Sequence, residues 1–223
     1  MFIGHFAPAF VAATHKDAPS LPVLFVAAQL VDWAFFGLVL AGVEQMRITP
    51  GFTKMNPLDL YLMPYTHSLV GGLAWAASFA FLISIGTRNR ATAIIAAAVV
   101  LSHWFLDVLV HGADMTIAGA PPRFGLGLWN FPAIEMSLEM ALTLGALWFY
   151  ARRTDGWRLP TFVLGAALLA TQTFNWFAPQ ATEMSAELPI SALLAFGALT
   201  GLAYWASRSQ HASSFVISRS RSK

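Results

Sequence analysis

The chain has 223 residues, of which 57% are hydrophobic and only 11% are charged. Soluble globular domains carry about 25% charged residues, so this composition excludes an ordinary solvated domain, and the absence of cysteine excludes a disulfide scaffold. The net charge of +2 comes from scattered basic residues, which do not form the basic patch of a nucleic-acid-binding protein. The composition therefore predicts a membrane protein with several spanning helices.

Six segments contain the roughly 20 apolar residues that a helix needs to cross the hydrocarbon core. They are Pro22–Val43, His67–Ile85, Ala91–Val110, Phe131–Ala151, Pro160–Ala178 and Leu188–Ala206. We expect Thr66 to be the N-cap of the second helix. Residues 1–13 are apolar but too short to cross, and they lack the basic start of a signal peptide, so they predict a retained interfacial or re-entrant helix.

The predicted fold class is therefore an all-α membrane helix bundle with about six transmembrane helices and a short N-terminal helix. Residues 1–206 form the single transmembrane domain, and residues 207–223, rich in Ser and Arg, form a disordered cytoplasmic tail. Ten of the 13 Lys and Arg residues fall on one side of this arrangement, and Arg47, Lys54 and Arg123 fall on the other. This asymmetry predicts cytoplasmic termini. The segments Glu44–Tyr65, Gly112–Asn130 and Pro179–Glu187 then face outward.

The spans contain no Lys or Arg, but they contain four of the 11 acidic residues: Asp32, Asp107, Glu135 and Glu139. An acid inside a membrane costs several kcal/mol unless it is paired or neutralised. Histidine is the one basic side chain present in these spans. The acids are therefore either protonated, or they share a cation that the sequence does not supply.

Histidines accompany these acids at a similar depth, in the outer half of the membrane. His103, Asp107 and His111 are spaced i, i+4, i+8 on one helix face, and His67 begins the second span at the same level. Singly, a histidine at a span end is an ordinary interfacial residue, and a buried glutamate can bond to a neighbouring hydroxyl or carbonyl. Together, imidazoles and carboxylates without thiolates suit a divalent metal, with zinc first and manganese or iron as alternatives.

Several short motifs, in this order, resemble a known family. They are Gly4-His5-Phe6, Asp32 in an apolar run, Thr66-His67-Ser68, and Ser102-His103 followed by Asp107. The order is similar to that in a bacterial inner-membrane family of LexA-regulated metal-dependent hydrolases, itself distantly similar to the helical zinc-dependent phospholipase C fold. The resemblance covers the first half of the chain, and it implies a bacterial inner-membrane location and the metal ligands His5, Asp32, His67, His103 and Asp107.

The six-span arrangement leaves His5 on the cytoplasmic side, so His5 can be a ligand only if residues 1–13 dip into the membrane. The predicted function is a metal-dependent hydrolase acting in the outer leaflet on an amphiphilic lipid or lipid phosphate. We expect His111 to be a further ligand, and Glu135 or Glu139 to be the general base or an additional ligand.

Two alternatives from other classes remain open. A proton- or cation-coupled transporter also uses intramembrane acids. A haem protein would use His67 and His103 as axial ligands. The expected partners are membrane lipid and a small amphiphilic substrate, without nucleic acid.

Overall fold

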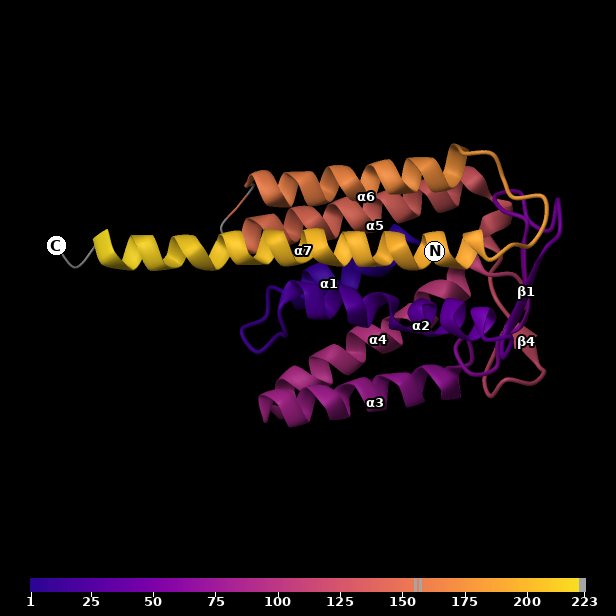
Figure 1. Ribbon diagram of the computed structural model, residues 1–223, viewed down its shortest axis with the longest axis horizontal. Coiled ribbons are helices and arrows are strands. Elements are labelled where there is room, and N and C mark those ends of the chain that lie inside the picture. Colours follow the sequence, from indigo (N-terminus) through magenta and orange to yellow (C-terminus); the bar gives the residue numbers. More distant parts are fainter. Residues whose placement is uncertain (155, 157, 221–223) are drawn as a thin grey trace.

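The structure is a computed structural model that describes residues 1–154, 156 and 158–220, with side chains as far as Arg208. Its described part is a bundle of helices with two small antiparallel hairpins at one end (Figure 1). The helices are η1 Ile3–His5, α1 Phe6–Ala12, α2 Leu21–Leu40, α3 Leu69–Thr87, α4 Arg90–Val110, η2 Leu128–Asn130, α5 Pro132–Arg153, α6 Leu159–Phe177 and α7 Glu187–Ser220. The strands are β1 Gln45–Ile48, β2 Leu58–Leu62, β3 Met115–Thr116 and β4 Arg123–Phe124.

The six predicted spans all form helices, and their boundaries are close to those that the apolar runs predict, except at the C-terminal end of the last one. Four of them, α2, α3, α4 and the first part of α7, are long and apolar enough to cross a membrane. α5 and α6 have comparable lengths but are not among these four, and α5 carries Glu135, Glu139, Arg152 and Arg153. The all-helical fold is confirmed, whereas six crossing helices and the orientation of the termini stay predictions.

Local signals explain where the long helices begin. Proline lies in the first turn of α2, α5 and α6, where its missing N–H costs no hydrogen bond. The expected cap of α3 was wrong: Ser68, and not Thr66, is the N-cap, and its Oγ accepts a hydrogen bond from the N–H of Gly71 at 3.0 Å. Thr66 lies two residues earlier, and its hydroxyl bonds elsewhere.

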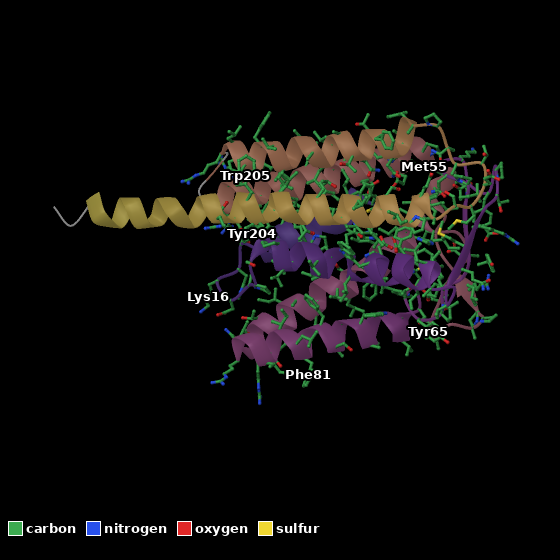
Figure 2. All side chains as sticks on the ribbon, viewed as in Figure 1. Lys16, Met55, Tyr65, Phe81, Tyr204 and Trp205 are labelled. Atoms are coloured by element: carbon green, nitrogen blue, oxygen red, sulfur yellow. The ribbon has the colours of Figure 1, made fainter. Side chains whose placement is uncertain are left out.

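The bundle is arranged as a chain of packed pairs. α3 packs on α4, α4 on α2, α2 on α7, and α7 on α6 (Figure 1). The hairpins β1–β2 and β3–β4 occupy two of the segments expected to be outward loops. They lie at the opposite end of the bundle from Lys16, on the same side as Met55 and Tyr65 (Figure 2). α7 continues as helix to Ser220, into the predicted tail; residues 221–223 lie outside the described part, and the disorder of the tail stays a prediction.

The N-terminal segment, defined here as residues 1–12, lies inside the bundle. Ile3, Phe6 and Phe10 are fully buried. The ring of Phe6 stacks on Phe25 of α2 at 4.3 Å between centroids, and Phe10 lies 5.6 Å from Tyr150 of α5. The segment is therefore part of the packed core, and its interfacial or re-entrant placement in the membrane stays a prediction.

Because the natural chain has no cysteine, single cysteine variants report this burial without background. We expect Ala9→Cys, at a fully buried position, to resist maleimide labelling in the folded protein and to react after denaturation. Lys16→Cys, at an exposed position, should react in both states. Equal labelling rates for the two folded variants would contradict the burial of the segment.

Candidate metal centre

The structure brings all six predicted metal ligands into one buried cluster. His5 comes from η1, Asp32 from α2, His67 from the turn before α3, and His103, Asp107 and His111 from α4 and its C-cap. Five of these residues are at most 2% exposed, whereas the side chain of Asp32 is 16% exposed. The i, i+4, i+8 spacing on α4 places its three members on the face that meets α2 and the N-terminal segment.

Asp107 is at the centre of the cluster. Its Oδ2 lies 3.1 Å from His103 Nε2, 3.5 Å from His67 Nε2 and 3.8 Å from His111 Nε2, and its Oδ1 lies 3.0 Å from His5 Nε2. Asp32 Oδ1 is 3.4 Å from His67 Nε2 and 3.5 Å from His103 Nε2. Two trios each place one ligand atom per residue within 4.8 Å of the others: His5, Asp32 and His103, and His67, His103 and Asp107.

The second nitrogen of the α4 imidazoles fixes their orientation. His103 Nδ1 lies 2.9 Å from the carbonyl oxygen of Ala28, and His111 Nδ1 lies 3.1 Å from Asp114 Oδ1. A carbonyl or an ionised carboxylate can only accept, so Nδ1 of each ring donates its N–H. A neutral ring then turns the lone pair of Nε2 toward Asp107.

In the neutral form of His103, this arrangement leaves the buried lone pair of Nε2 facing Asp107 Oδ2 at 3.1 Å. His103 Nε2 and both ring nitrogens of His5 have no hydrogen-bond partner in the part of the chain that the structure describes. A buried acceptor facing carboxylate oxygens is unfavourable unless a cation lies between them. The donor set of imidazole nitrogens and carboxylate oxygens therefore fits a divalent metal ion.

His5 joins the cluster because the N-terminal segment enters the bundle. Its ring stacks on that of His103 with 3.7 Å between centroids. The amino group of Met1 lies 3.0 Å from Asp107 Oδ1, on the same side. The burial of the N-terminal segment in the bundle thus brings His5 to the cluster, while the dip of residues 1–13 into the membrane stays a prediction.

The two glutamates of α5 differ in what they contact. Glu139 Oε1 accepts hydrogen bonds from the backbone N–H groups of Phe2 (2.6 Å) and Gly4 (3.0 Å), and Oε2 accepts one from Gln172 Nε2 at 2.8 Å. Glu139 therefore holds the segment that carries His5. Glu135, one turn earlier, is equally buried, and its Oε2 has no hydrogen-bond partner among the described residues.

The predicted site did not include several residues that support the cluster. Gln29 donates from Nε2 to the carbonyl of Phe2 at 3.0 Å, and Asp114 orients His111. Asp114 could have been found from its spacing, three residues after His111. Glu44 was assigned to an outward loop, where acids are common, yet it is fully buried beside Thr66.

We expect Glu139→Leu to release the N-terminal segment, because it removes the acceptor for two backbone N–H groups. Each buried donor left unpaired costs about 1–3 kcal/mol. The cysteine of Ala9→Cys should then become reactive toward maleimide in the folded protein. Thr143→Val is the matched control, because Thr143 lies one turn further along α5 and its buried hydroxyl has no partner among the described residues. Continued protection of the cysteine in Glu139→Leu would show that other contacts hold the segment.

Comparisons of this chain with protein-family models, curated proteins and solved structures find no match. Function must therefore be inferred from the structure of this chain alone. The chain has apolar helices that could cross a membrane and His/Asp groups that could hold a metal ion.

Proposed function

We propose that the protein is an integral membrane metal-dependent hydrolase whose His/Asp cluster acts on an amphiphilic substrate, a lipid or a lipid-linked phosphate. The observation that carries the proposal is the convergence of four Nε2 atoms on two carboxylates, with the Nδ1 atoms of His103 and His111 bonded to acceptors on the far side of the rings. Oriented imidazoles of this kind are typical of metal ligands. This proposal also retains the family resemblance as an expectation.

The residues would divide the work as follows. His67, His103 and Asp107 would hold the ion, with Asp32 on the more exposed side of the cluster and His5 and His111 as further ligands. A divalent ion held there would supply Lewis acidity and lower the pKa of a water that it binds. Glu135 is the better candidate for proton acceptor, because its Oε2 is unpartnered among the described residues, whereas Glu139 is engaged with the N-terminal segment.

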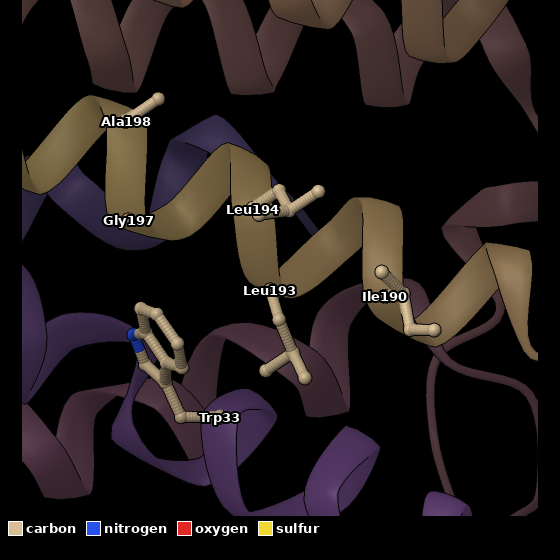
Figure 3. A pocket seen from close by; sticks show the side chains of 6 residues that line it. All are labelled: Trp33, Ile190, Leu193, Leu194, Gly197 and Ala198. Atoms are coloured by element: carbon tan, nitrogen blue, oxygen red, sulfur yellow. The ribbon is translucent and has the colours of Figure 1, made fainter.

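An apolar cavity supports an amphiphilic substrate. It is largely open to the surface, has a volume of about 500 Å³ and lies between α2 and α7, lined by Trp33, Ile190, Leu193, Leu194, Gly197 and Ala198 (Figure 3). Trp33 directly follows Asp32, the most exposed member of the cluster. A cavity of this size suits a hydrocarbon chain, with the polar group of the same molecule directed toward the cluster.

The geometry does not favour the haem alternative. His67 Nε2 and His103 Nε2 both contact Asp32 Oδ1, at 3.4 Å and 3.5 Å, and both contact Asp107 Oδ2, at 3.5 Å and 3.1 Å. Carboxylate oxygens thus occupy the space between the two imidazoles where a porphyrin plane would have to pass. The arrangement suits a small cation better.

Elemental analysis of the purified protein tests the proposal. We expect about one or two transition-metal ions per chain, and loss of both the metal and the hydrolysis of lipid phosphate in His103→Ala and in Asp107→Ala. His15→Ala is the matched control, because the side chain of His15 is 56% exposed and lies outside the cluster. Full metal content in both cluster variants would refute the proposal. Cation-dependent flux in vesicles without lipid turnover would favour the transporter instead.

A further inference from the structure

The carboxylate of Glu44 is buried next to the metal centre, although it contacts none of its imidazoles directly. Glu44 lies between α2 and β1 and is fully buried. Its Oε1 accepts hydrogen bonds from the backbone N–H groups of Tyr65 (2.8 Å) and Thr66 (3.0 Å). Its Oε2 accepts one from the hydroxyl of Thr66 at 2.6 Å. Three donors converge on this carboxylate, an arrangement complementary to its ionised form.

The hydroxyl of Thr66 connects the carboxylate of Glu44 to the imidazole of His67. A hydroxyl has one proton to donate, and the proton of Thr66 is directed to Glu44. Thr66 Oγ1 must therefore accept in its other contact, which is His67 Nδ1 at 2.9 Å. His67 then carries its proton on Nδ1, and the lone pair of Nε2 faces Asp32 and Asp107 at 3.4 Å and 3.5 Å.

We infer that Glu44 is a positioning residue that, through the hydroxyl of Thr66, sets the tautomer of His67 for metal binding. The inference rests on the proposed function, since it assigns a role within the same centre. In this role the Thr66 hydroxyl accepts the Nδ1–H of His67, as the carbonyl of Ala28 does for His103 and the carboxylate of Asp114 does for His111. Each of the three rings is thereby held with Nε2 available to a metal ion.

A simpler role for Glu44 would be to hold the turn before α3 through the backbone N–H groups of residues 65 and 66. The two roles use different oxygens: Oε1 holds the backbone, and Oε2 holds the hydroxyl. Glu44→Gln separates them. The amide oxygen can keep both backbone bonds, while the amide NH₂ replaces Oε2 and donates to Thr66 Oγ1. The Thr66 proton must then go to His67 Nδ1, which leaves the imidazole proton on Nε2, facing the carboxylates.

The experiment uses the full-length protein in detergent, with two readouts. Zn²⁺ affinity is measured by competition with a chelating dye, and the tautomer of His67 is read from ¹⁵N-histidine spectra of the metal-free protein, with His67→Asn assigning the signal. We expect Glu44→Gln and Thr66→Val to bind Zn²⁺ about 10–100-fold more weakly. Thr66→Ser should bind like the natural protein because it keeps the hydroxyl. In Glu44→Gln the proton should move from Nδ1 to Nε2.

Asp59→Asn is the matched control, because it makes the same acid-to-amide change in the β1–β2 hairpin, where Asp59 pairs with Arg47 and not with a histidine. Unchanged Zn²⁺ affinity together with an Nδ1–H signal of His67 in Glu44→Gln would overturn the inference. The only role of Glu44 would then be to hold the backbone N–H groups of residues 65 and 66. If Glu44→Gln fails to fold, equal affinity of Thr66→Val and Thr66→Ser overturns it. If the natural protein binds no Zn²⁺, the proposed function fails, and the tautomer spectra still decide whether Glu44 sets the proton on His67.

Discussion

The structure depends on the buried carboxylate of Asp107, which four imidazoles surround. After Arg90, which is its first residue, the helix that carries Asp107 contains no lysine or arginine, so the negative charge has to be met by groups from elsewhere in the chain. In an apolar interior an unmet charge costs several kcal/mol. This demand accounts for the imidazoles that the N-terminal segment and the turn before α3 bring to the same face of α4. Asp32 of α2 adds a second carboxylate, which the imidazoles of His67 and His103 meet.

Around that centre the fold uses two kinds of polar support. One kind holds imidazoles from behind: the carbonyl of Ala28 for His103 and the carboxylate of Asp114 for His111. The other kind holds buried, irregular backbone inside the bundle, whose N–H groups need acceptors. Glu139 supplies them for the N–H groups of Phe2 and Gly4. Three buried carboxylates, in positions 44, 114 and 139, thus serve as supports and not as direct members of the two metal-binding trios.

The helices and the shared face of His103 and Asp107 on α4 could be predicted from the sequence because both depend on local spacing. Apolar runs give the helix positions, and the i, i+4 interval puts His103 and Asp107 on one face. The supports of the centre could not be predicted in this way. Glu44 lies 22 residues from Thr66 in a polar segment, and Glu139 meets the backbone of Gly4 across 135 residues. Such pairs are decided by packing, and a single sequence carries no spacing signal for them.

The two central carboxylates differ in exposure, so one side of the cluster is more accessible than the other. Asp107 is enclosed by imidazoles on several sides, whereas Asp32 is partly exposed and is followed by Trp33, which lines the apolar cavity between α2 and α7. A closed ligand set would suit a structural ion, while a catalytic ion needs an open position. The proposed substrate would therefore approach from the side of Asp32, with its hydrocarbon part against α7 and its polar group nearest the carboxylate that has the fewest neighbours in the cluster.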